Sequence, residues 1–411
     1  MAITACENQE SCTDGNNRMA VIHPPQVLVS SPYYVPGFRA GGALRAVANL
    51  VSQLGRKIDF KIITRDRDAF SDLPYDGITR ETWLKINDAQ VYYVDRSKLS
   101  FGCWHKLLNN EQYDVLYLNS LFSFWFSIKP AILARFGLLR SSRILLAPRG
   151  ELSLGALGLK SRKKRLFLAL ARHTGLYRGV TFQASSQYER ADIARVFGDR
   201  VRIVVAADIP APPPSTSRPK RKGKADLARF LFLGRIAPVK NLKGVLLTLI
   251  NCKQECELRI VGPIDDEIYW KECQELIDHM PRVIRVEYMG EIDNGKLDDV
   301  FSVNHFLLLP SLSENFGHAI YESLARGTPV LVGDKTPWRD LQAKGIGWDI
   351  PLENEKAWEE AVSSCISMTA EKYEAMSTLC MEHARMFATD SSLFGQTYDL
   401  FAAFKPSPIK L

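Results

Sequence analysis

Short apolar segments of strand length alternate with helix-length segments along almost the whole chain, in two successive series. Alternation of this kind is typical of parallel sheets that carry helices on both faces. The sequence therefore predicts an α/β protein with two doubly wound sheets. The predicted strands are Val27–Ser30, Phe60–Thr64, Val91–Val94, Val115–Leu118, Ile144–Ala147, Val180–Ala184 and Arg202–Val205 in the first series, and Phe230–Leu233, Leu258–Val261, Arg285–Tyr288, Phe306–Leu309 and Pro329–Val332 in the second.

A proline-rich and then basic run, Pro210–Lys224, lies between the two series. A compact core would not contain this composition, and we interpret the run as a linker between domains. The expected organisation is a disordered tail at 1–20, an N-terminal domain at 21–207, a linker at 208–225, a C-terminal domain at 226–390, and a last helix with a tail at 391–411.

The composition excludes several classes of protein. With 411 residues, of which 46% are hydrophobic, the chain has the make-up of a folded protein of about two or three domains. Its longest apolar run, Leu121–Ile128, is shorter than the roughly 20 residues of a transmembrane helix, and its polar start lacks a signal-peptide pattern. The eight cysteines lack the paired spacing of a metal site. We therefore expect reduced thiols, no metal and a cytoplasmic location.

The segment Ser313–Glu322 places two glutamates around an expected helix start. Backbone N–H groups from Asn315 to Gly317 would point out of the helix N-terminus, where they and the helix dipole favour an anion such as a diphosphate. Glu314 precedes the helix, whereas Glu322 lies about 9 Å along its axis. One carboxylate can then hold sugar hydroxyls and the other ribose hydroxyls. By itself, such a pair of glutamates also fits an ordinary solvated helix.

A second candidate anion site precedes the first by about eighty residues. The predicted strand Phe230–Leu233 runs into a Gly234-Arg235 turn, and Lys240 follows near the next helix start. A guanidinium fork and an ammonium group together neutralise a diphosphate. Both segments follow predicted strands, and ligands of doubly wound sheets bind beyond the carboxyl ends of the strands.

These segments resemble retaining glycosyltransferase family 4, the "group 1" glycosyltransferases. The resemblance covers nearly the whole chain. Within the family, Ala147–Leu152 and the downstream Ala156–Lys160 are similar to a bacterial subgroup that builds lipopolysaccharide, capsule or exopolysaccharide. The residues that carry it are Gly41-Gly42, Gly234-Arg235, Lys240-Asn241, Val261-Gly262-Pro263, Gly290, Pro310-Ser311, Glu314 to Glu322, Ala325, Gly327 and Pro329-Val330.

The resemblance implies the GT-B fold, in which two Rossmann-like doubly wound domains face each other across a cleft, and a last helix near Ser391–Phe404 that crosses back to the first domain. It also implies retaining transfer of a sugar from a nucleotide-sugar donor to a saccharide acceptor, which we expect to be lipid-linked, without a metal or other cofactor. We assign Arg235, Lys240 and Glu314 to catalysis. The donor-binding set is Gly41, Gly42, Arg149, Gly262, Gly290, Glu291, Ile292, Asn315, Phe316, Gly317 and Glu322. Whether Arg149 or Glu151 contacts the donor sugar stays open.

Three further features have two interpretations each. The basic and then apolar segment Lys160–Arg172 fits either an anionic membrane surface, which would make the protein peripheral at the inner face of the cytoplasmic membrane, or a core helix with a solvated basic start. Asp66-Arg67-Asp68 has metal-site spacing, but we expect a surface loop or an acceptor contact. His318 can face the phosphates or serve in capping or packing, and we leave it outside the catalytic set.

Other functions remain as alternatives. A sugar-nucleotide epimerase or hydrolase of the same fold would use the same phosphate site, and a non-catalytic scaffold of a polysaccharide-assembly complex would keep the fold alone. An NAD-dependent oxidoreductase is excluded because no G-x-G-x-x-G follows the first strand of either series. No nucleic-acid-binding signature accompanies the basic residues, so we expect no nucleic acid partner.

Overall fold

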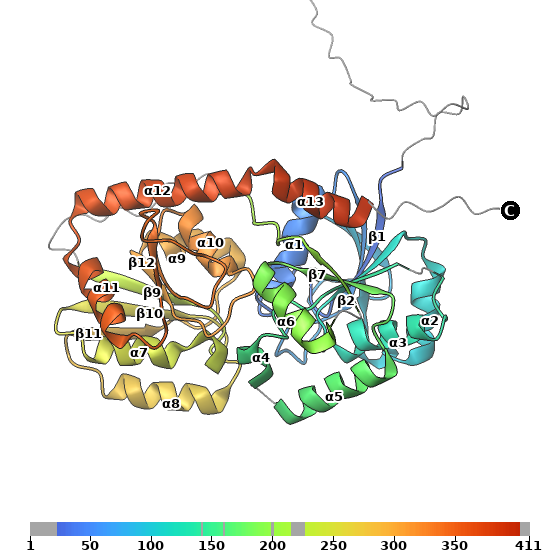
Figure 1. Ribbon diagram of the computed structural model, residues 1–411, viewed down its shortest axis with the longest axis horizontal. Coiled ribbons are helices and arrows are strands. Elements are labelled where there is room, and N and C mark those ends of the chain that lie inside the picture. The colour runs from blue at the N-terminus through green and yellow to red at the C-terminus, as the bar shows by residue number, and fades with distance from the viewer. Residues whose placement is uncertain (1–22, 141–142, 159–160, 199–200, 215–226, 403–411) are drawn as a thin grey trace, which may run out of the picture.

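The computed structural model describes residues 23–140, 143–158, 161–198, 201–214 and 227–402, which form two α/β lobes side by side (Figure 1). The predicted fold class is confirmed. The predicted tail at 1–20, most of the basic linker run and Lys160 lie outside the described residues.

The N-terminal lobe contains an eight-stranded sheet in the order β3-β4-β2-β1-β5-β6-β7-β8, in which only β3 runs antiparallel to its neighbour. Apolar strands in the middle of the sheet are buried on both faces, as parallel strands covered by helices must be. The elements are β1 (Gln26–Ser30), α1 (Gly42–Leu54), β2 (Asp59–Arg65), β3 (Trp83–Ile86), β4 (Ala89–Val94), α2 (Phe101–Asn110), β5 (Val115–Asn119), α3 (Lys129–Arg135), β6 (Ile144–Ala147), α4 (Leu154–Gly158), α5 (Ser161–Thr174), β7 (Val180–Ala184), α6 (Gln187–Phe197) and β8 (Arg202–Val205).

The C-terminal lobe contains a six-stranded parallel sheet in the order β11-β10-β9-β12-β13-β14, the order of a doubly wound nucleotide-binding domain. Its elements are β9 (Ala228–Leu233), α7 (Leu242–Ile250), β10 (Cys256–Val261), α8 (Glu267–Asp278), β11 (Ile284–Tyr288), α9 (Leu297–Ser302), β12 (Phe306–Leu309), α10 (His318–Ala325), β13 (Val330–Gly333), β14 (Gly347–Ile350), α11 (Glu355–Ser367) and α12 (Ala370–Ala388). The chain then continues into α13 (Ser391–Ala402).

Two strands, β3 and β14, were not predicted. β3 is a half-exposed edge strand, and a tight turn in which Asn87 has a φ of 50° joins it to β4. Because the strand is half-exposed, it lacks the continuous run of apolar residues by which a buried strand is recognised. β14 contains Gly347, which has a φ of 152° and would place a Cβ 2.1 Å from the carbonyl oxygen of Val330. Close pairing with β13 therefore makes this segment a strand, against its glycine and aspartate content.

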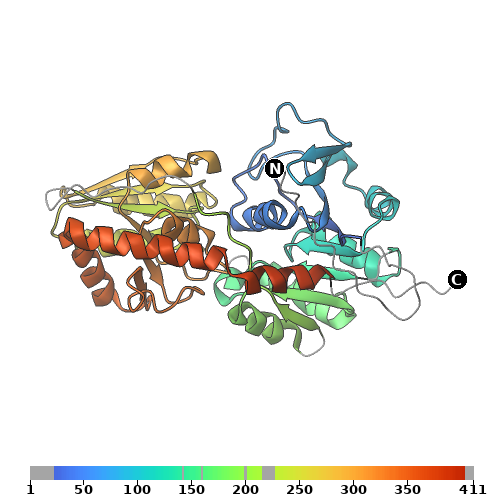
Figure 2. The same ribbon diagram turned by 90° about the horizontal axis from the view of Figure 1, so that it is seen from above.

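The last two helices connect the lobes. α12 lies along the C-terminal lobe and α13 continues end to end along the N-terminal lobe (Figure 2). Phe401 of α13 packs edge-on against Phe60 and Tyr117, with ring centroids 6.2 and 5.4 Å apart. The chain thus returns to the lobe in which it began.

In each sheet the chain reverses its direction of strand addition at one point, between β1 and β5 and between β9 and β12. Ligands of open α/β sheets bind beyond the carboxyl ends of the strands at such points. The loops after β1, β9 and β12 carry Gly41-Gly42, Arg235 and Glu314, and the contacts described next bring them together.

Candidate active site

Arg235 follows β9 at a turn that depends on Gly262. The Gly234 N–H donates to the carbonyl of Val261 at 3.0 Å, and the Gly262 N–H donates to that of Gly290 at 2.9 Å. Gly262 has a φ of +146°, and a Cβ built on it would lie 2.0 Å from the carbonyl oxygen of Gly234. Only glycine fits there. Arg235 Nη1 lies 2.5 Å from Asp265 Oδ2, and both side chains stay partly exposed.

Lys240 and Glu314 form an ion pair between the loops after β9 and β12. Lys240 Nζ lies 2.5 Å from Glu314 Oε1, and the Ser311 hydroxyl donates to the same oxygen at 2.7 Å. The Glu314 side chain is 8% exposed and that of Lys240 is 20% exposed. The pair is therefore largely shielded from water. A hydroxyl group of a ligand can replace Lys240 as the partner of the Glu314 carboxylate only if the ligand enters the site.

The loop before α10 leaves backbone donors without acceptors. In the part of the chain that the structure describes, the N–H groups of residues 315–319 donate to no acceptor. Gly317 caps the helix with a φ of +81°, and a Cβ there would lie 3.1 Å from Trp338 Nε1, which donates to the Phe316 carbonyl at 2.6 Å. Phe316 is buried among aromatic rings, so only its backbone is available to a ligand. This helix start suits an anion.

Glu322 faces the N-terminal lobe. Its Oε1 pairs with Arg45 of α1, whereas its buried Oε2 has no partner within the described residues. The glycine loop before α1 lies close by: a Cβ on Gly42 would lie 3.3 Å from His318 Cδ2, and one on Gly41 would lie 3.9 Å from Arg235 Nε. Sequence reasoning gave Arg45 no role, because nothing in the chain order shows that α1 and α10 meet.

Arg149 is held inside the N-terminal lobe. Its guanidinium pairs with Asp208, donates to Asn119 Oδ1 at 2.7 Å and donates to the Tyr117 hydroxyl at 2.6 Å. Arg149 itself has a left-handed φ of 58°, which is uncommon for a residue with a side chain. These contacts fix the loop after β6, and the contact of Arg149 with the donor sugar stays a prediction.

Glu151 is also buried within the N-terminal lobe. It accepts hydrogen bonds from the Leu121 N–H at 2.5 Å, the Phe122 N–H at 3.1 Å and the Ser120 hydroxyl at 2.9 Å. Burial nevertheless raises the pKa of this carboxyl. Glu151 thus orders the loop after β5 and does not extend toward the other lobe.

His318, the first residue of α10, lies between the lobes. Its ring is 8% exposed, and Nε2 has no hydrogen-bond partner among the described residues, with Asp208 Oδ2 3.9 Å away. Burial holds its pKa well below the usual value, and the cations of Arg45, Arg149 and Lys240 add to the shift. The ring is therefore neutral at neutral pH. Neither of the interpretations made from the sequence is decided by these contacts.

The residues expected near the base lie at the ends of β10 and β11. Glu291 pairs with Arg39 of the N-terminal lobe. Gly290 has a φ of +74° with open space around its Cα, and Ile292 packs against the C-terminal core. Gly290 and Glu291 thus lie near Gly262, whereas Ile292 has a packing role.

The Asp66-Arg67-Asp68 segment is not a surface loop. Asp66 is 1% exposed and pairs with Arg67 and Arg80, and Asp68 accepts from the N–H groups of Phe38 and Arg39. Asp68 thus organises the loop after β1, whereas Asp66 holds two arginines of the segment after β2. Across the described ranges, no group of three or more His, Cys, Asp or Glu side chains is arranged to hold a metal ion.

Part of the chain is similar to known glycosyltransferases. The family model described as "Glycosyl transferases group 1" matches residues 215–378. A phosphatidyl-myo-inositol mannosyltransferase of Mycobacterium leprae is 27% identical over 169 residues, which are 39% of this chain and 44% of that protein. The O-antigen chain mannosyltransferase RfbU of Salmonella typhimurium is 26% identical over 135 residues, or 33% of this chain and 37% of that protein. The chain thus spans less than half the length of these curated relatives.

The fold itself extends over both lobes in solved structures. Anabaena Alr3699/HepE in complex with UDP-glucose superposes with a TM-score of 0.65 at 14% identity, covering 93% of this chain and 100% of that one. Likeness at this identity shows the fold alone. The family match shows that residues 215–378 resemble the group 1 glycosyltransferases, and the superposition shows that both lobes share the two-domain GT-B fold.

Proposed function

We propose that this protein transfers a sugar from a nucleotide-sugar donor to a hydroxyl of a saccharide acceptor, with retention of configuration. The observation that carries the proposal is the convergence of Arg235, Lys240, two largely buried glutamates and the free N–H groups of residues 315–319 at one place between the lobes. Convergent donors of this kind stabilise the charge that grows on a leaving diphosphate.

The mechanism needs positioning and charge, since the donor already carries a good leaving group. As the bond from the anomeric carbon to the phosphate oxygen breaks, negative charge develops on the diphosphate. Arg235, Lys240 and the α10 amides stabilise that charge. The acceptor oxygen forms its bond on the same face, and its proton passes to the departing β-phosphate oxygen. Glu314 would hold sugar hydroxyls and Glu322 the ribose. We propose that the protein's own cations suffice and that no divalent metal ion takes part.

Relatives support a role in building cell-surface glycans. The two curated relatives are named for mannosyl transfer to phosphatidyl-myo-inositol and to the O-antigen chain, and the solved neighbour was crystallised with UDP-glucose. We therefore propose a lipid-linked saccharide acceptor in lipopolysaccharide, capsule or exopolysaccharide synthesis.

Calorimetry with UDP, GDP and ADP tests the donor site. One nucleoside diphosphate is expected to bind the wild-type protein selectively, with and without EDTA, and its sugar derivatives are then assayed with lipid-linked acceptors. Transfer with retained configuration supports the proposal. Donor hydrolysis or epimerisation without transfer would favour the epimerase or hydrolase alternative, and no binding at millimolar concentration would favour a scaffold.

Glu322→Gln is expected to weaken binding of that nucleotide about 10-fold, because a hydrogen bond from ribose to a charged acceptor is worth about 1.5–3 kcal/mol. The effect is checked with the 2′-deoxy and 3′-deoxy forms of the nucleotide. Wild type should discriminate against at least one of them, whereas the variant should not. Equal discrimination by both proteins would place the ribose elsewhere.

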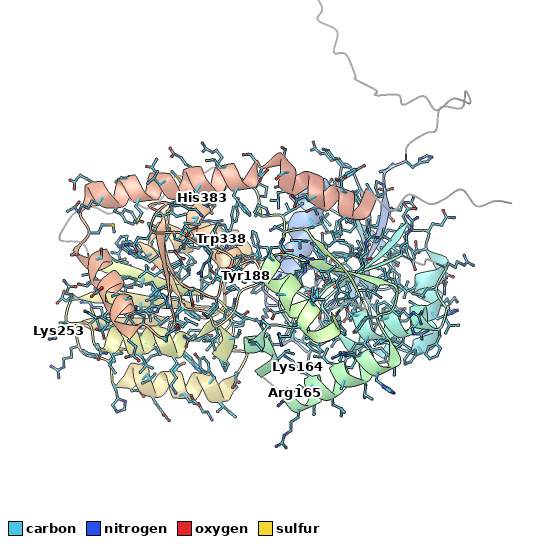
Figure 3. The ribbon with its side chains drawn as sticks, viewed as in Figure 1. Lys164, Arg165, Tyr188, Lys253, Trp338 and His383 are labelled. Atoms are coloured by element: carbon cyan, nitrogen blue, oxygen red, sulfur yellow. The ribbon has the colours of Figure 1, made fainter. Side chains whose placement is uncertain are left out.

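α5 carries the features of a helix that rests on a membrane. Leu166 and Leu170 are 64% and 55% exposed, one turn apart, while Leu168 and Ala171 are buried against the lobe. Figure 3 places Lys164 and Arg165 near the start of this helix, at the lower edge of the molecule, and exposed Arg162, Lys163 and Arg172 flank the leucines. No helix among the described residues has the length and apolarity needed to cross a bilayer. We propose that this face contacts anionic lipid.

Replacing Leu166 and Leu170 with serine is expected to lower binding to phosphatidylglycerol-containing vesicles about 10-fold or more, since each leucine loses apolar burial. Vesicle sedimentation at low and high salt measures this. Ile268→Ser, which changes an exposed apolar residue of α8, should leave binding unchanged. If the leucine variant sediments like wild type, α5 is a core helix with a solvated basic start.

A further inference from the structure

Glu189 is a buried carboxylate of the N-terminal lobe to which no function has been given so far. It lies in the first turn of α6 and is 4% exposed. One oxygen accepts from the Gly150 N–H at 2.6 Å and the other from the Ser185 N–H at 2.8 Å. These bonds join the loops after β6 and β7, but they leave acceptor capacity on a charged group that water barely reaches.

Asn315 of the C-terminal lobe fills that capacity. When its amide is oriented so that nitrogen faces the acceptors, Nδ2 lies 3.1 and 2.7 Å from the two oxygens of Glu189, and Oδ1 accepts from the Ser185 hydroxyl at 3.0 Å. The two carboxylate oxygens of Glu189, which accept hydrogen bonds when ionised, favour this orientation. Gly150 permits the approach, since a Cβ there would lie 3.1 Å from the Asn315 Cβ. The contact joins α6 to the loop before α10.

We propose that Glu189 is a positioning residue for the donor, which holds the phosphate-binding loop of the other lobe through Asn315. The inference rests on the proposed function. Asn315 begins the run of free N–H groups at 315–319, so fixing its side chain fixes the direction of those donors. Because Glu189 belongs to the other lobe, the loop reaches this arrangement only when the two lobes are together. Donor affinity is thereby coupled to closure of the domains.

The contact between Glu189 and Asn315 also depends on the protonation of the Glu189 carboxyl group. Burial raises the pKa of Glu189 to about 7, against the hydrogen bonds from Ser185 and Gly150. The charged and titratable side chains that act on it are Arg149 after β6 and Asp208 after β8, together with Tyr117 of β5. An asparagine amide can donate to a carboxylate or, turned over, accept from a carboxylic acid, so the wild-type contact tolerates either state.

Asn315→Asp separates this role from a general structural one. An aspartate can pair with Glu189 only when the two carboxyl groups share a proton, so the contact should fail at high pH and re-form at low pH. We expect the variant to bind the nucleotide about 10-fold or more weakly than wild type at pH 8, and within about 3-fold at pH 5.5. Comparing the two proteins at each pH removes the effect of shared titrating groups.

Glu189→Gln/Asn315→Asp is the rescue variant. The glutamine amide can donate to the introduced aspartate at any pH, but its nitrogen replaces one of the two oxygens that accept from the Gly150 and Ser185 N–H groups, so we expect part of the affinity to return at pH 8 and the pH dependence to flatten. Asn251→Asp is the matched control, because Asn251 donates to Glu359 at 3.0 Å in an exposed pair on the other side of the C-terminal lobe. It should bind like wild type throughout. A pH-independent loss in Asn315→Asp, or a double variant whose affinity relative to wild type still falls between pH 5.5 and pH 8, would overturn the proposal.

Failure of the proposed function would be visible separately, as absence of nucleotide binding by wild type. Small-angle X-ray scattering then tests the contact without ligand. Asn315→Asp should have a larger radius of gyration than wild type at pH 8 and the same radius at pH 5.5, as the lobes part and rejoin. Equal radii at both pH values would show that Glu189 does not hold the lobes together.

Discussion

Replacing both Arg235 and Lys240 with alanine is expected to lower nucleotide affinity and transferase kcat/KM by about 10²–10⁴-fold. Each residue contributes a charge-assisted hydrogen bond of about 1.5–3 kcal/mol to the diphosphate, and the two losses add to about 3–6 kcal/mol. The loss in kcat should exceed the loss in affinity, because the leaving diphosphate gains charge in the transition state. Calorimetry and initial-rate kinetics measure the two separately.

Removal of Lys240 also leaves Glu314 as a buried carboxylate without its ion-pair partner. The fold of the double variant therefore has to be verified by circular dichroism and urea unfolding before binding is compared. Lys243→Ala is a suitable control, since Lys243 belongs to the same segment but pairs with Glu272 in an exposed position. If the double variant is folded and still binds the nucleotide with wild-type affinity, the diphosphate does not bind at this site.

Gly262→Ala is expected to destabilise the C-terminal domain by about 4 kcal/mol and to abolish nucleotide binding. The added Cβ would lie 2.0 Å from the Gly234 carbonyl oxygen and 3.4 Å from the Arg235 backbone nitrogen, at a φ of +146° that side chains rarely adopt. Overpacking against backbone and a forbidden φ each cost about 1–3 kcal/mol. The turn that carries Arg235 would have to move.

Gly290→Ala distinguishes the clash from the cost of positive φ alone. Gly290 has a φ of +74° in the same domain, but a Cβ there would meet nothing within 4 Å, so we expect a loss of only about 1–2 kcal/mol. Urea midpoints followed by tryptophan fluorescence compare the two variants. Equal midpoints would mean that the backbone at Gly234 and Gly262 moves apart to accommodate the added Cβ without lowering the free energy of unfolding.

Much of the fold was predictable because its signals are local. Strand length, apolar content and the glycine and proline residues that end each segment are properties of neighbours in the chain. The predicted strands agree within one residue at each end with β1, β2, β5, β6, β7, β8, β11, β12 and β13. β3 and β14 were not predicted, because their pairing with β4 and β13 is a tertiary contact. The local pattern of apolar residues does not indicate such a contact.

The site shows the same division. Arg235, Lys240, Glu314 and Glu322 stand at recognisable distances from strand ends and a helix start, so the sequence alone indicated these donors and carboxylates of the C-terminal lobe. The tertiary structure alone decided the partners across the two lobes, which are Arg45 for Glu322 and Glu189 for Asn315. The physical reason is that helix starts and turns arise from interactions within a few residues, whereas these pairings exist only because two separately wound sheets bring their carboxyl ends together and exclude water between them.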